Sequence, residues 1–256
     1  MKFKLTIQKS SIILIAVMIF IAAGLLAANV ALKQVYDKVD KTDTYWNYNN
    51  ILDKPYKYLK ITGGNVTNII YQPSPHSSVR VLNYWQSAIR DSIKAYVSND
   101  TLYLNFPNKY DNQGDKYWMG GSVLVRLFGP ELLYVDGTDT KFELQKLKQK
   151  NVNIKLSGRS RLEVETYQHD FDSLSVAAQD SSQVVFEMSP DLNGSPLMSF
   201  RHVSASITGY TVVDVGRASI KDLDLKIADT SAIILSGQAW RGTLGNNNGS
   251  GVLPIN

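Results

Sequence analysis

Five stretches of this chain share one pattern, in which apolar residues stand at every second position on both sides of a small turn. The clearest is Val152 to Val164, where Ser157-Gly158-Arg159-Ser160 separates two apolar runs. Strict alternation puts the apolar side chains on one face of an extended strand, and the glycine marks where the chain bends. The pattern therefore predicts pairs of short strands joined by tight turns.

The five stretches can be aligned on the central small residue of the turn. These centres are Gly137, Gly158, Asp180, Gly209 and Asp229, so their spacings are 21, 22, 29 and 20 residues. The long interval contains an insertion at 189–196. A period near 21 residues with short alternating strands is typical of a parallel β-solenoid, whose turns stack about 4.8 Å apart. Hairpins of a sandwich or barrel give similar spacings, but the equal positions of Gly/Asp and Ser/Thr favour stacking.

A single such turn is too small to fold alone. Four inward side chains contribute roughly 6–12 kcal/mol of burial, whereas ordering about 20 residues costs roughly 20–40 kcal/mol of backbone entropy. Neighbouring turns must therefore share the stabilisation. We expect both ends to be capped, by the first strands and by the segment beginning at Trp240.

The N-terminal region contains an uncharged apolar run from Ser11 to Leu32. A helix of about 20 such residues spans the roughly 30 Å hydrocarbon core of a bilayer. The run predicts an uncleaved membrane anchor, because it is longer than the apolar region of a signal peptide and lacks a clean Ala-X-Ala site. The alternative is secretion after cleavage behind Ala28 or Ala31.

Lysines on the two sides of the apolar run are nearly balanced, so they do not set its orientation. We place the C-terminal part outside the cytoplasm, periplasmic or extracellular, because of the kind of domain that follows. The predicted organisation is a tail (1–10), an anchor (11–32), a stalk (33–57), a β-helix domain (58–243) and a flexible tail (244–256).

Composition limits the chemistry available to this chain. It has no cysteine and three histidines, so thiolate zinc sites, cysteine nucleophiles and histidine-rich metal centres are not expected. A net charge of +4 spread over 256 residues does not predict a nucleic-acid partner. We expect no metal, no cofactor and no catalytic residue.

Two sets of residues are candidates for a site. The polar loop at 107–121 contains Tyr110, Tyr117 and Trp118, which are the best ligand-binding candidates; the alternative is that these aromatics fold back as a lid over the core. A polysaccharide lyase or hydrolase would need convergent carboxylates and a cation, for example Asp136, Asp139 and Lys155. Aspartate at turns more often bonds the local backbone.

Several segments resemble a known family. They are Leu59-Lys-Ile-Thr-Gly-Gly-Asn-Val66, Asn99-Asp-Thr-Leu-Tyr-Leu104, Gly129-Pro-Glu-Leu-Leu-Tyr-Val-Asp-Gly137 and Leu156-Ser-Gly-Arg-Ser160. In this order they resemble the "putative auto-transporter adhesin head GIN domain" family of bacterial extracytoplasmic proteins, over about 58–238. The family often repeats Ser-Gly-Ser-Gly, which survives here only in part, at Ser157-Gly158 and Ser236-Gly237.

The resemblance implies a right-handed parallel β-helix, so the fold class predicted is all-β, with about 20–22 residues per turn after one transmembrane helix. The predicted function is non-enzymatic: an adhesin-like binding or structural role at the cell envelope. Its partners would be the membrane, through 11–32, and an envelope glycan or protein. The alternatives are a polysaccharide-active enzyme on the same scaffold and an ectodomain that senses the state of the envelope.

Overall fold

The chain divides into two units, Met1–Asn47 and Tyr48–Asn256. A computed structural model describes residues 9–65, 67–83, 93–106, 123–147, 149–165, 169–187, 198–216 and 218–235. In the first unit, the helix α1 covers Lys9–Asp37 and includes the predicted anchor. Its 29 residues rise about 43 Å. In the described part of the chain it is the one helix long and apolar enough to cross a membrane.

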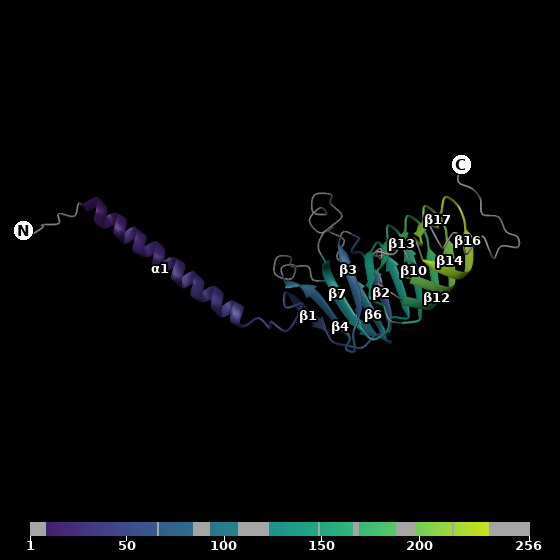
Figure 1. The fold of residues 1–256 in the computed structure, drawn as a ribbon, viewed down its shortest axis with the longest axis horizontal. Helices are drawn as coiled ribbons and strands as arrows, with labels where there is room; N and C mark the ends of the chain where they lie inside the picture. Colours follow the sequence, from purple (N-terminus) through teal and green to yellow (C-terminus); the bar gives the residue numbers. More distant parts are fainter. Residues whose placement is uncertain are drawn as a thin grey trace, which may run out of the picture. The chain divides into compact units, whose positions relative to one another are not determined.

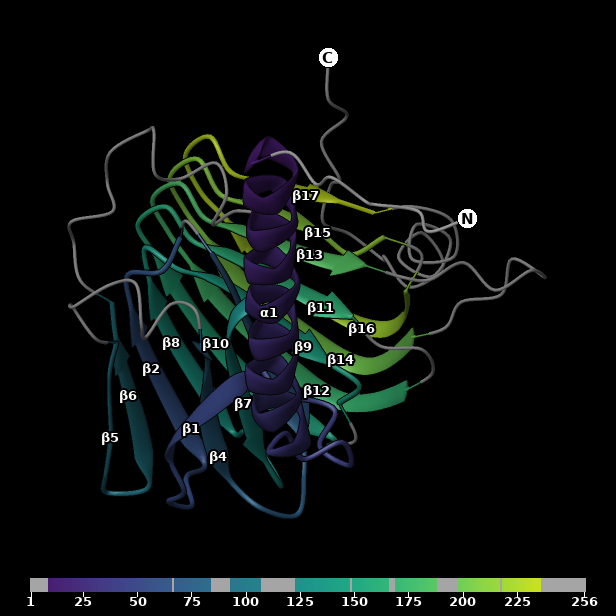
Figure 2. The same ribbon diagram turned by 90° about the vertical axis from the view of Figure 1, so that its left-hand side faces the viewer.

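The second unit contains two β-sheets (Figures 1 and 2). The nine strands of the first, sheet A, are β1 (Tyr48–Leu52), β4 (Ser78–Leu82), β7 (Val123–Gly129), β3 (Asn68–Pro73), β9 (Lys141–Gln145), β11 (Arg161–Glu165), β13 (Gln183–Glu187), β15 (Val212–Asp214) and β17 (Ala232–Ile234), in spatial order. The eight of the second, sheet B, are β16 (Ser219–Ile227), β14 (Met198–Ile207), β12 (His169–Ala178), β10 (Asn151–Ser157), β8 (Tyr134–Thr138), β2 (Tyr58–Thr62), β6 (Thr101–Asn105) and β5 (Lys94–Ser98).

The predicted right-handed parallel β-helix is wrong, because the strands form two large mixed sheets and not a closed solenoid. Strand β4 pairs antiparallel with both β1 and β7, and β5 pairs antiparallel with β6. The β5–β6 pair has a local cause. Asn99 and Asp100, with φ of 48° and 56°, form a two-residue turn of the kind that reverses the chain into a hairpin.

From β8 onward the chain alternates between the sheets, and neighbouring strands are parallel. Ile154 lies opposite Val176, Val176 opposite Ala205, and Ala205 opposite Leu225. These are the positions that the sequence alignment equates for the last four centres. The alignment of the first centre is wrong: Gly137 lies in β8 opposite Leu156. A Cβ on Gly137 would lie 2.7 Å from the Thr140 methyl, so the glycine leaves room for core packing.

From β8 onward, the turn that joins each sheet B strand to the next sheet A strand has a residue with positive φ. This residue is alternately aspartate and glycine: Asp139, Gly158, Asp180, Gly209 and Asp229. The Asp180 carboxylate accepts a hydrogen bond from the Gly158 N–H (2.8 Å), and the Asp229 carboxylate accepts one from the Gly209 N–H (3.2 Å). Aspartate tolerates this conformation, and here it also caps the backbone of the preceding turn.

Asp229 makes turn stability depend on pH. Hydrogen bonds from the Thr208 hydroxyl (2.6 Å) and from the Gly209 N–H lower the pKa of its carboxyl. Their stabilisation is fully present above the unfolded-state pKa of about 3.9 and is lost as pH falls through the lower folded-state pKa. We expect Asp229→Asn to be less stable than the wild type at pH 7, with a difference that shrinks below about pH 4. Urea unfolding across this range checks it, and a pH-independent difference would contradict it.

The inward residues of both sheets form one apolar core. Two tyrosines of this core form hydrogen bonds with backbone carbonyls, and these bonds link the N-terminal strands. The Tyr56 and Tyr71 hydroxyls donate to the carbonyls of Phe128 and Gly129, both at 2.9 Å. Burial raises the pKa of both phenols, so they stay neutral donors. The outward faces of the two sheets are therefore the surfaces that carry polar and aromatic side chains.

Candidate functional site

Four tyrosines project from the outer face of sheet B, one from each of four neighbouring strands. They are Tyr96 of β5, Tyr103 of β6, Tyr58 of β2 and Tyr134 of β8. Together with Lys60, Asp136 and Lys155 we call this set the tyrosine face. Tyr58 and Tyr96 are 39% and 49% exposed, so their rings are available to solvent. The pairing registers place them in two neighbouring rows across the strands, Tyr96 beside Tyr103 and Tyr58 beside Tyr134. Three strand intervals of about 4.8 Å give the group a width of about 14 Å.

Tyr96 and Tyr103 are stacked. They lie directly opposite each other in the β5–β6 hairpin, and their ring centroids are 4.9 Å apart with planes inclined by 6°. This distance lies within the range that aromatic pairs favour. Tyr58 lies opposite Tyr134 in the parallel pair β2–β8. The hairpin and the central position of β2 therefore bring together tyrosines that are up to 76 positions apart in the chain, from 58 to 134.

Charged groups lie beside these rings. Lys60 is opposite Tyr103 on one side and opposite Asp136 on the other, and Asp136 is opposite Lys155. The Lys60 ammonium is 3.8 Å from the Asp136 carboxylate, with the lysine side chain 51% exposed. An exposed ion pair of this length contributes little to stability. These groups therefore remain available for contacts with a ligand.

The second carboxylate of the polysaccharide-active alternative, Asp139, is bound elsewhere. Asp136 and Lys155 are neighbours, but the Asp139 carboxylate accepts a hydrogen bond from the Arg159 N–H (2.9 Å) at the turn. Asp172 forms an ion pair with Arg201 (3.1 Å). In the described ranges, no three His, Cys, Asp or Glu side chains gather where a metal ion would bind. The geometry does not favour a paired-carboxylate mechanism.

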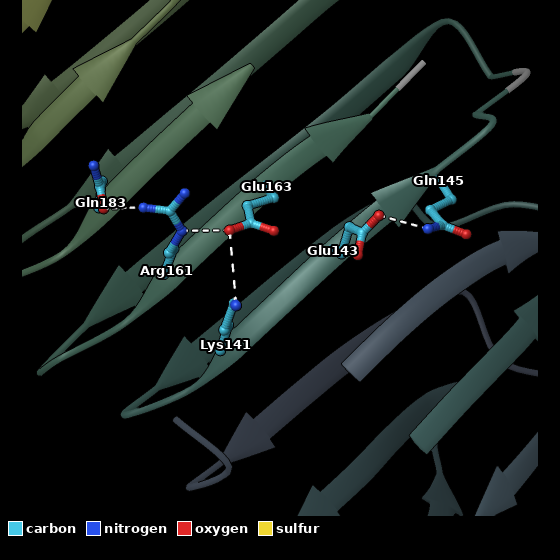
Figure 3. A network of polar contacts seen from close by, with 6 residues as sticks. All are labelled: Lys141, Glu143, Gln145, Arg161, Glu163 and Gln183. Atoms are coloured by element: carbon cyan, nitrogen blue, oxygen red, sulfur yellow. Dashed lines mark hydrogen bonds and ion pairs between the residues drawn. The ribbon is translucent and has the colours of Figure 1, made fainter. Parts of the chain in front are cut away.

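The outer face of sheet A carries a different polar cluster, shown in Figure 3. The Glu163 carboxylate accepts a hydrogen bond from the Arg161 Nε and lies 4.0 Å from the Lys141 ammonium. Arg161 also donates to Gln183, and Gln145 donates to Glu143. The positive charges of the two cations in this cluster balance the negative charges of its two carboxylates. Since its groups already bond one another across β9, β11 and β13, we regard it as a stabilising network of sheet A.

Two arginines of sheet A lie opposite each other, Arg80 of β4 and Arg126 of β7. The Arg80 guanidinium lies 5.7 Å from the centroid of the Phe128 ring, and that of Arg126 lies 5.4 Å from the centroid of the Tyr48 ring. Attraction to the ring faces offsets part of the repulsion between like charges on adjacent strands. This arrangement explains how sheet A accommodates two arginines on adjacent strands.

The predicted ligand-contacting residues Tyr110, Tyr117 and Trp118 lie outside the described residues, as does the 189–196 insertion. Sequence reasoning did not single out the tyrosine face, although one signal for it was present. The turn Asn99-Asp100 places residues 96 and 103 at equal distances on its two sides, and alternation puts Tyr103 on the opposite face from Leu102 and Leu104.

Comparisons with known proteins give distant structural similarity. No protein-family model and no curated protein sequence matches this chain. Three solved structures are similar over 73% of it: a "putative lipid binding protein" from Parabacteroides distasonis (15% identity, 95% of that chain, TM-score 0.38), a "putative adhesin" from Bacteroides fragilis (13%, 95%, 0.41) and a "putative adhesin" from Parabacteroides merdae (13%, 94%, 0.30). The resemblance to the GIN-domain family stays a prediction.

Proposed function

We propose that this chain is a membrane-anchored binding protein of the bacterial envelope, and that its tyrosine face binds an extended glycan. The observation that carries the proposal is the group of four tyrosines, in two cross-strand pairs, beside Lys60, Asp136 and Lys155 on the outer face of one sheet. The C–H groups on the flat side of a sugar ring pack against an aromatic ring. Phenol, ammonium and carboxylate groups can exchange hydrogen bonds with sugar hydroxyls.

The shape of the surface favours a polymer over a small molecule. Small-molecule sites are concave and bury most of their ligand, whereas these tyrosines lie on the outer side of a sheet over a width of about 14 Å. Several weak contacts along a chain add through their effective concentration. The polar loop at 107–121, which contains Tyr110, Tyr117 and Trp118, follows Phe106 in the chain, and we propose that it contributes contacts to the same ligand.

The binding experiment uses the full chain in detergent. In one assay it is mixed with peptidoglycan sacculi, which are then sedimented. In a second assay it is mixed with purified lipopolysaccharide, and binding is measured by the change in intrinsic protein fluorescence. We expect saturable binding to one of these glycans. Binding to neither, together with retention of an envelope protein, would contradict the proposal and favour a protein partner.

The anchor is proposed to be 11–32, with the β-sheet unit outside the cytoplasm. We expect the full 28.5 kDa chain to stay in the membrane fraction after high-salt and alkaline washes, because apolar insertion is insensitive to both. Deletion of 11–32 should release it. Protease added to intact cells or spheroplasts should digest the sheet unit. A soluble product whose measured mass corresponds to a chain beginning after Ala28 or Ala31 would show that the segment is a cleaved signal sequence.

A further inference from the structure

The outer edge of β16 is the open end of sheet B. Strand β14 pairs with one side of β16, and within the described residues no strand pairs with the other. The apolar residues here are more exposed than their partners in β14. Ile227 is 45% exposed, whereas Ile207 opposite it is 1% exposed, and Leu225 is half-buried opposite the buried Ala205. In the described part of the chain, the end of the sheet therefore presents both apolar side chains and an unshared backbone edge, and the cap predicted from Trp240 lies outside that part.

Within the described residues, this edge lacks three of the usual protections against pairing, although charged side chains lie on its outer face. Natural edge strands are kept apart by short length, proline or charges that point inward. β16 has nine residues, no proline, and apolar side chains at 223, 225 and 227, the positions that lie opposite the buried Val203, Ala205 and Ile207. We propose that β16 is the contact surface of a homodimer, in which it pairs antiparallel with β16 of a second copy about a two-fold axis at Leu225.

Backbone hydrogen bonding supports this register. The Ala228 N–H donates to the Ile207 carbonyl (3.0 Å), on the β14 side. Because successive residues of a strand direct their backbone groups to opposite sides, those of Leu223, Leu225 and Ile227 point to the open edge. A two-fold axis at Leu225 sets Leu225 against its own copy and Leu223 against Ile227. These residues can then form about six hydrogen bonds across the axis.

Charge complementarity selects the same axis. Asp224 and Lys226 are exposed on the outer face of β16. An axis at Leu225 sets Asp224 of each copy against Lys226 of the other, at the pairs whose Cα atoms are closest, about 4.5 Å apart. An axis one residue away in either direction would oppose Asp224 or Lys226 to itself, which is unfavourable. The strand is thus complementary to a second copy of itself in this one register.

Disulfide trapping tests the contact in the full chain, which contains no cysteine. In the proposed pair the two Leu225 Cα atoms lie about 5.5 Å apart, within the range that a disulfide bridges. We expect Leu225→Cys to give mostly covalent dimer on mild oxidation in membranes. Ser206→Cys is the control, because Ser206 is exposed on β14, which is paired on both edges. At least tenfold less dimer is expected there, and equal cross-linking of the two variants would overturn the proposal.

Charge reversal tests the register. We expect Asp224→Lys and Lys226→Asp each to raise the dimer dissociation constant more than tenfold, measured by sedimentation of the full chain in detergent. The double variant should return to within about threefold of the wild type, because it restores both pairs. Far-UV circular dichroism confirms that each variant is folded. A monomeric wild type, unchanged dimerisation in the single variants, or a double variant as weak as the single ones would each overturn the proposal.

Discussion

Gly209→Ala is expected to lower the free energy of unfolding by about 3 kcal/mol, because it combines an unfavourable backbone conformation with a steric clash. Gly209 has φ of 76°, and a Cβ there would lie 2.6 Å from the Asp180 carbonyl oxygen and 2.9 Å from the Asp180 nitrogen. Both atoms belong to the backbone of the adjacent turn, so they move only if the turn moves. Urea unfolding of the full chain in detergent measures the change.

Gly216→Ala is the matched control. Gly216 also has positive φ (58°), but its nearest neighbour to a new Cβ is the Phe186 carbonyl oxygen at 3.1 Å. We expect a loss of about 1 kcal/mol, mostly from the backbone conformation. If the two variants lost equal stability, the close approach of consecutive turns would not be what requires glycine at 209.

Removing both stacked tyrosines, with Tyr96→Ala and Tyr103→Ala together, is expected to weaken glycan binding by 10- to 100-fold. If each ring contributes to a sugar contact as much as it does to an aromatic pair, about 1 kcal/mol, the two rings together account for this loss, since 1.4 kcal/mol corresponds to a factor of ten in affinity. Tyr103→Phe should bind nearly as well as the wild type, since it keeps the ring. The measurement is a titration of the full chain with whichever glycan it binds.

The matched control for the double variant is Tyr210→Ala. Tyr210 is 73% exposed and follows Gly209 in a turn, away from the tyrosine face. Its removal should leave glycan affinity within about twofold of the wild type. Equal losses in Tyr210→Ala and in the double variant would mean that exposed tyrosines bind glycan non-specifically. In that case the tyrosine face would have no particular role in binding.

Local features of the fold were predictable from the sequence. Alternation identified the inward residues of the later strands, and the centres Gly158, Asp180, Gly209 and Asp229 all have positive φ as turn residues. Gly137 misled the alignment, because a glycine needed for packing in a strand has the same sequence signal as one needed for a turn. The structure distinguishes the two roles by the pairing of Gly137 with Leu156 and by its φ, which unlike that of Gly158 is not positive.

Long-range pairing was not predictable. The prediction of a parallel array extended a local period to the whole domain, whereas β1, β4 and β5 join the sheets antiparallel. For the same reason, the candidate site could not be predicted from the sequence. Alternation shows that Tyr58, Tyr103 and Tyr134 point outward, but it does not show that β2 lies between β6 and β8. Side-chain period is a property of one strand, while sheet order depends on the packing of all of them.

The position of β2 has a consequence for how the domain assembles. β2 precedes β6 and β8 in the chain but lies between them in the sheet. It therefore has neither neighbour when it leaves the ribosome or a translocation pore, and gains the second only after Thr138 has emerged. Pairing of this kind must pay a loop-closure cost before it is stabilised. The later strands add to an edge that already exists, so we expect the slow step of assembly to lie in the half of the domain that carries the tyrosines.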